Sequence, residues 1–134
     1  MELHRFSQQM KGGCGLLACS LTFLFGSLDN LLQVFLALLA LDYFTGVLAS
    51  FISGKLLNSR KGLEGIAKKV MLLTLVVLSN LMDHMLHTPG SLRALVIGFL
   101  VANESISILE NCKKCGIPIP LKLKETIDRL KNTP

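Results

Sequence analysis

The sequence predicts an all-α integral membrane protein with three to four short transmembrane helices and a C-terminal amphipathic helix. Of its 134 residues, 51% are hydrophobic and only 17% are charged. The charged residues gather between long apolar runs, as loop residues gather between membrane spans. No alternating strand pattern is present, and a helix satisfies its own backbone hydrogen bonds within lipid. Hydropathy and charge layout together therefore favour a helical membrane domain.

Four apolar runs are the candidate spans of a single transmembrane domain, residues 12–111. They lie at residues 12–28, 31–53, 70–87 and 92–110. A crossing helix needs about 20 residues, with about 17 as the lower limit, so only 31–53 crosses with residues to spare. The first run has the charged start and apolar middle of a signal peptide, but a second apolar run follows it where a soluble domain would begin. We expect a retained helix, and whether residues 12–28 cross completely stays open.

The basic residues predict the orientation. They cluster in the N-terminus (1–11), in a loop (54–69) and in a polar tail (112–134). With both termini inside, every Lys and Arg except Arg93 falls on the cytoplasmic side, as the positive-inside rule requires. We therefore expect a multi-pass protein of the bacterial inner (cytoplasmic) membrane with a cytoplasmic C-terminus, and Arg93 snorkelling from a helix end. The basic loop carries Lys55, Arg60, Lys61, Lys68 and Lys69.

Two further segments, 62–70 and 121–131, have an amphipathic helical pattern. In the tail segment, Leu123, Ile127 and Leu130 share a face that charged residues surround, and Pro118 and Pro120 precede it. A basic amphipathic helix after a span can lie on the anionic inner leaflet. The alternative is a short solvated tail helix, and the pattern leaves both open.

Acidic side chains inside the spans are the candidate functional residues. Asp42 lies at the midpoint of 31–53, Asp83 toward the outer end of its span, and Glu104 in the inner half of the last. A carboxylate at a helix centre costs about 2.5–3.5 kcal/mol on insertion scales. No central Lys or Arg is available to pair with these acids, so we expect them to be protonated, hydrogen-bonded across helices or wetted by a pore. Their candidate partners are Thr45, Asn80, Asn103 and Ser107.

Small residues form a predicted packing surface in the second half of the main span. Gly46, Ser50 and Gly54 are four residues apart, and so are Thr45, Ala49 and Ser53. Small residues at this spacing let helix backbones approach closely. The contact is either within one subunit or between subunits.

Metal and enzyme chemistry are not indicated. Asp83, His84 and His87 lie together, but three ligands on one helix rarely close a metal site, so we expect a polar helix end and no metal or other cofactor. Cys112 and Cys115 form a single CxxC, which supplies too few ligands for zinc. No catalytic triad or nucleotide fingerprint is present. We expect neither an enzyme nor a nucleic-acid-binding protein.

Several ordered motifs resemble the phage lysis and toxin-secretion holin family. The most specific are Asp-aromatic-x-Thr-Gly at 42–46, Lys-Gly-x-x-Gly-Ile-x-Lys-Lys at 61–69 and Asn-Glu-Ser-x-Ser-Ile-x-Glu-Asn at 103–111. The resemblance covers about residues 12–131. The recurrent positions of the family fall on Asp42, Thr45, Gly46, Lys61, Gly62, Gly65, Lys68, Lys69, Asp83, Glu104, Ser107, Glu110 and Asn111.

The resemblance implies a holin, which oligomerises in the cytoplasmic membrane and permeabilises it for release of endolysin or toxin and lysis of the host cell. Its partners would be further copies of itself and a bilayer with anionic lipids, with endolysin as a functional partner that needs no direct contact. The alternatives are a small multidrug-type proton-coupled exporter subunit and an antiholin that regulates lysis timing. Against the exporter, the first run has no acid and the chain has no Trp. Met10 offers a second start, as some holins use for timing.

Overall fold

The computed structural model describes residues 15–54 and 59–132, and these fold into helices joined by short turns. This confirms the all-α class and the C-terminal helix. After a short apolar helix, Gly15–Phe25, come four longer elements: α2 (Asn30–Ile52), α3 (Ser59–Leu86), α4 (Ser91–Lys114) and α5 (Leu121–Asn132).

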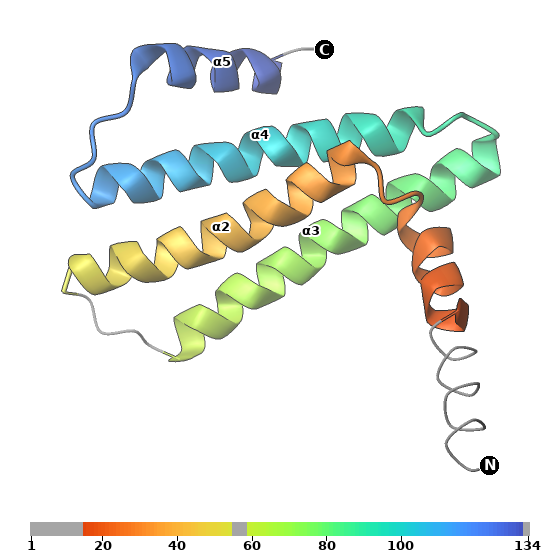
Figure 1. The fold of residues 1–134 in the computed structure, drawn as a ribbon, viewed down its shortest axis with the longest axis horizontal. Coiled ribbons are helices and arrows are strands. Elements are labelled where there is room, and N and C mark those ends of the chain that lie inside the picture. The colour runs from red at the N-terminus through yellow and green to blue at the C-terminus, as the bar shows by residue number, and fades with distance from the viewer. Residues whose placement is uncertain (1–14, 55–58, 133–134) are drawn as a thin grey trace, which may run out of the picture.

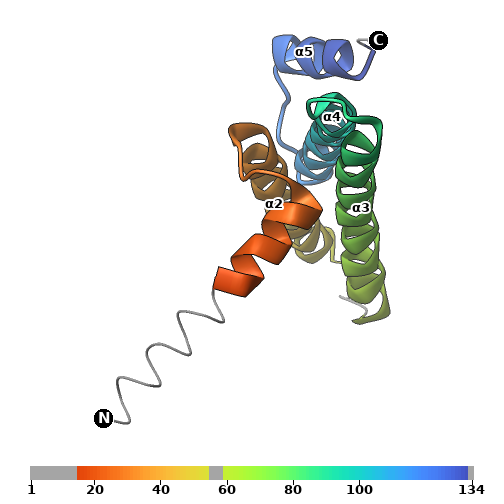
Figure 2. The same cartoon turned by 90° about the vertical axis from the view of Figure 1, so that its right-hand side faces the viewer.

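α4 is the central helix of the bundle. It packs against α2, α3 and α5, whereas α2 and α3 touch each other little. α2 and α4 run in the same direction and α3 runs against both (Figure 1). α5 lies on the side of α4 away from α2 and α3, which the end-on view in Figure 2 also shows. This order brings the C-terminal ends of α2 and α4 beside the N-terminal end of α3.

Among the described residues, three helices are long and apolar enough to cross a membrane, by length and composition. They are Asn30–Ile52, Gly62–Leu86 and Ser91–Lys114, with 23, 25 and 24 residues. Their buried core is small and includes Leu32, Phe35, Val76, Ile97 and Leu100. Most other large apolar side chains point outward, such as Phe44 and Phe51 on α2, at 60% and 76% exposure. Such a surface suits a hydrocarbon surrounding.

The first apolar run is the weakest candidate span. Its described helix, Gly15–Phe25, has only about three turns, well short of the roughly 17 residues that a crossing helix needs. It leaves the bundle steeply at the end where α2 begins (Figure 1). Residues 1–14, with Met10 and Cys14, lie outside the described residues. A complete crossing by 12–28 therefore stays a prediction.

The expected basic loop, 54–69, is wrong over most of its length. α3 already begins at Ser59, because Lys, Glu and Ala are good helix formers and no Pro interrupts them. Arg60 and Glu64 add an exposed ion pair one turn apart, with 3.7 Å between Nε and Oε1. The amphipathic helix predicted for 62–70 is therefore part of α3 and forms the start of the candidate span Gly62–Leu86. Lys55 lies outside the described residues, as does the side chain of Lys61.

Gly26 ends the short helix in a place where only glycine fits. Its φ is +77°, and a Cβ added there would lie 2.8 Å from both Arg93 Nε and Asn80 Oδ1. Positive φ strains any residue with a Cβ. The chain can turn at this point and start α2 only because position 26 has no side chain.

We expect Gly26→Ala to lower the free energy of unfolding by about 1–3 kcal/mol, through backbone strain and contact with Arg93 and Asn80. The measurement is thermal unfolding in detergent micelles followed by circular dichroism. Gly15→Ala is the matched control, since Gly15 is helical and nothing lies within 4 Å of its added Cβ. Equal melting temperatures for the two variants would contradict the prediction.

Candidate functional site: an ionic cluster between the three spans

One lysine joins two carboxylates at the centre of the bundle. Lys69 Nζ lies 2.8 Å from Asp42 Oδ2 and 2.8 Å from Glu104 Oε2. Each group comes from a different span: Asp42 from α2, Lys69 from α3 and Glu104 from α4. The three side chains are only 13%, 16% and 5% exposed for Lys69, Asp42 and Glu104. Asp42, Lys69 and Glu104, here called the ion trio, therefore connect all three spans at the same height along the bundle.

Two neutral polar side chains complete the hydrogen-bond network around Asp42. Asn111 Nδ2 donates to Asp42 Oδ1 and to Thr45 Oγ1, at 3.2 Å each. Thr45 Oγ1 itself donates to the backbone oxygen of Asp42 at 3.1 Å. At the rim, Lys114 Nζ donates to Asn111 Oδ1 at 3.3 Å. We call Asp42, Thr45, Lys69, Glu104 and Asn111 the interhelical cluster.

The expectation that the intramembrane acids lack a cationic partner is wrong. The charge pattern predicts a loop at Lys69, but this residue lies about two turns inside the candidate span Gly62–Leu86. Its neighbour Lys68 is exposed. The sequence could have indicated this position of Lys69 if residues 61–69 were treated as a helix. Gly62, Gly65 and Lys69 then fall on one face, at three- and four-residue spacing. That face meets α2, where Tyr43 lies 4.0 and 3.9 Å from Cβ atoms added at the two glycines.

Asp83 does not belong to the cluster; it organises the turn between α3 and α4. Its carboxylate accepts hydrogen bonds from the backbone N–H of Leu92 at 3.1 Å and of Arg93 at 2.8 Å, and from the Thr88 hydroxyl. α4 begins after Gly90, which has no side chain to cap it. The free N–H groups of a helix start need acceptors. Asp83 supplies them from the preceding helix.

Arg93 forms a second buried centre at this same end of the bundle. Its Nη1 lies 2.6 Å from Asp29 Oδ2, while Nε and Nη2 donate to the backbone oxygens of Phe25 and Ser27 at 2.7 and 2.8 Å. The residue is only 6% exposed, so the expectation that it snorkels outward is wrong. The guanidinium instead fastens the turn before α2 to α4. Its hydrogen bond holds the pKa of the Asp29 carboxyl below its usual range.

The remaining predicted polar residues fall into different places. Asn80 is buried and donates to the backbone oxygens of Phe23 and Leu24 at 2.9 and 3.1 Å, so it secures the first helix. Ser107 is half-buried and shares the α4 face of Glu104 and Asn111 by its spacing. Asn103 is exposed. Neither Asn80 nor Asn103 joins the interhelical cluster.

The small residues of α2 pack within the subunit over part of their length. Gly46 faces α4, with 3.6 Å between its added Cβ and Asn111 Nδ2, and Ala49 is 3% exposed. Ser50 is half-buried, whereas Ser53 and Gly54 are exposed where the helix ends. Gly46 thus lies beside the Asn111 amide that donates to Asp42.

The described residues show no group of His, Cys, Asp or Glu that could hold a metal ion. His84 instead stacks on Phe23, with ring centroids 5.8 Å apart. Cys112 and Cys115 are free, half-buried thiols near the end of α4.

Three apolar spans around a shared ionic cluster define a small multi-span helical membrane protein. The chain belongs to the bacteriophage holin family, whose sequence profile matches residues 19–132. This is a membrane-permeabilising, non-enzymatic family. Family membership confirms the resemblance seen in the sequence.

Similar proteins occur in several bacteria. An uncharacterized protein of Halalkalibacterium halodurans is 37% identical over 91% of this chain and 93% of its own length. An uncharacterized 14.9 kDa protein from the nagH 3′ region of Clostridium perfringens is 40% identical over 92% and 93%. An uncharacterized protein of Listeria monocytogenes is 43% identical over 78% and 74%. The comparison with solved structures found no match to this chain.

We expect Lys69→Met to destabilise the bundle by about 3–5 kcal/mol, because it leaves two buried carboxylates without their cation. Thermal unfolding in micelles measures the effect. Lys68→Met is the control, since that side chain is exposed one residue away. Adding Asp42→Asn and Glu104→Gln to Lys69→Met should recover much of the loss. A loss as large for Lys68→Met would refute the role of Lys69.

The contribution of the Asp29–Arg93 ion pair to stability should depend on pH. Because the pKa of Asp29 is lowered in the folded protein, its contribution to stability is present above about pH 4 and is lost as the pH falls through the lowered value. Asp29→Asn removes the ion pair but keeps a side chain that can cap α2. The difference in melting temperature between wild type and Asp29→Asn should therefore shrink between about pH 5 and pH 2. A constant difference would contradict this assignment.

Proposed function

We propose that this protein is a holin that oligomerises in the bacterial cytoplasmic membrane and permeabilises it, so that endolysin or a toxin is released. Membership of the holin family supports a holin-type function. The observation that carries the finer proposal is the set of three charged groups in the interhelical cluster. They come from three different spans and are held inside a molecule with an apolar exterior. Endolysin is then a functional partner, and no direct contact with it is required.

The cluster suits a protein with two states. In the single subunit, Lys69 satisfies Asp42 and Glu104, so the charges are hidden from lipid. With all three ionised, the trio still carries one net negative charge. Charged groups in spans normally face protein or a water-filled cavity. If the helices repack between subunits at high density, these side chains become the polar wall that a water-filled opening needs.

The distribution of cations supports the proposed orientation. The end of the bundle where α2 and α4 terminate carries Lys113 and Lys114, and the segments beside it add Arg60 and Lys68. At the opposite end, Arg93 is neutralised by Asp29. By the positive-inside rule the first end, and with it the C-terminus, lies in the cytoplasm.

Expression of the chain alone in bacteria tests the function. A holin should collapse the membrane potential, and culture density should fall once an endolysin is supplied. An antiholin would leave the potential intact, and an exporter subunit would give substrate-coupled proton flux in vesicles. An intact potential at confirmed membrane levels of the protein would overturn the holin proposal.

We expect the triple variant Asp42→Leu, Lys69→Met and Glu104→Met to insert and fold but to permeabilise later or not at all. Replacing a whole buried ion group with apolar residues is often neutral for stability or stabilising, whereas it removes the polar lining of the open state. Membrane fractionation checks insertion, and a potential-sensitive dye times permeabilisation. Lys68→Met serves as the control. Unchanged timing in the triple variant would show that the cluster is structural only.

A further inference from the structure

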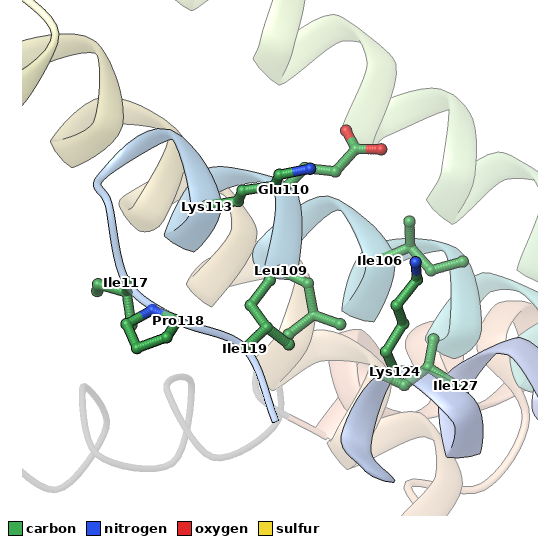
Figure 3. A pocket seen from close by; sticks show the side chains of 9 residues that line it. All are labelled: Ile106, Leu109, Glu110, Lys113, Ile117, Pro118, Ile119, Lys124 and Ile127. Carbon is green, nitrogen blue, oxygen red and sulfur yellow. The ribbon is translucent and has the colours of Figure 1, made fainter. Parts of the chain in front are cut away.

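α5 rests on α4 with an incomplete fit. Ile127 is its one residue that is buried among the described side chains, while Leu121 and Leu123 are 76% and 46% exposed. A pocket of about 470 Å³ lies between α4, α5 and the segment 117–119 that connects them (Figure 3). It is lined by Ile106, Leu109, Glu110, Lys113, Ile117, Pro118, Ile119, Lys124 and Ile127. Close-packed helix interfaces leave few such voids, so α5 covers α4 with only part of its apolar surface.

The position of α5 also conflicts with a bilayer around α4. Ile106 and Ile127 line the same pocket. Ile106 precedes the end of α4 at Lys114 by about two turns of helix. If α4 crosses a membrane, the middle of α5 would then lie at hydrocarbon depth. Its exposed Lys122 and Glu125 would lose their hydration there, which is costly for charged side chains.

We propose that in a bilayer α5 separates from α4 and lies in the interface on anionic lipid. The segment between the helices can act as the hinge: Gly116 has a φ of +78°, and residues 117–120 form no helix. Pro118 and Pro120 lack the N–H that would continue one. This inference rests on α4 crossing the membrane, which is part of the proposed function, and not on permeabilisation.

The chemistry of α5 fits an anionic lipid surface. Leu123 and Ile127, one turn apart, form an apolar face that can enter the boundary between headgroups and acyl chains. Lys122, Lys124 and Arg129 can reach lipid phosphates, and each cation near an anionic leaflet adds to the attraction. The departure of α5 also leaves Ile106 and Leu109 on α4 facing lipid chains. Both helices then have surroundings that match their side chains.

A single tryptophan reports the position of α5, because the chain has none of its own. The full chain with Leu123→Trp is reconstituted in phosphatidylcholine vesicles with and without phosphatidylglycerol, using lipids brominated at shallow or deep acyl positions. With phosphatidylglycerol present, we expect emission at shorter wavelength and stronger quenching by shallow than by deep bromines. Glu125→Trp, on the opposite face of α5, is the matched control and should stay weakly quenched.

Charge variants test the lipid preference. Lys122→Glu with Lys124→Glu in the Leu123→Trp background should abolish the effect of phosphatidylglycerol, and Glu125→Lys should strengthen it. Quenching that is strongest with deep bromines would place α5 beside α4 and overturn the proposal. A response equal in the two lipid mixtures would overturn it as well. Because vesicle leakage is not the readout, a chain that fails to permeabilise but shows shallow quenching would contradict the proposed function alone.

Discussion

The bond between Lys69 and two carboxylates is the interaction on which the arrangement of the spans depends. Hydrocarbon cannot solvate Asp42 or Glu104, so each needs a partner from within the protein. Lys69 reaches both at 2.8 Å only if α2, α3 and α4 meet at one level. The ion trio therefore fixes the relative heights of three helices whose apolar surfaces alone would allow sliding, since lipid and leucine are equally apolar.

The two ends of the bundle are held by different means. At the end where α2 begins, Asp83, Arg93 and Asp29 satisfy backbone groups of the turns, and the connection from α3 to α4 is short and closed. At the other end, Asn111 links Asp42 to Lys114 by hydrogen bonds, and further cations lie beside Lys114. One end is thus closed by hydrogen bonds to the turns, whereas the other carries exposed cations and the segment that leads to α5.

Hydropathy, charge layout and the two prolines were enough to predict the helical class, the long spans and the tail helix, because these depend on composition along one segment. The choice of Asp42 and Glu104 as candidates, together with Asp83, also followed from the cost of a carboxylate in lipid. The partner did not, because Lys69 stands in a run of charges that resembles a loop, and only the helical phase shows it facing inward. The role of Arg93 depended on backbone oxygens of Phe25 and Ser27, which no side-chain pattern reveals.

Under the proposed function, the same cluster also accounts for a closed state that precedes permeabilisation. A core without excess charge would gain little from the entry of water, whereas carboxylates without any partner would oppose insertion into the membrane. Lys69 satisfies two carboxylates at once, and with all three groups ionised one negative charge stays in excess. In the proposed mechanism the closed subunit is stable among lipids, and an assembly that lets water reach Asp42 and Glu104 gains the solvation that the single subunit lacks.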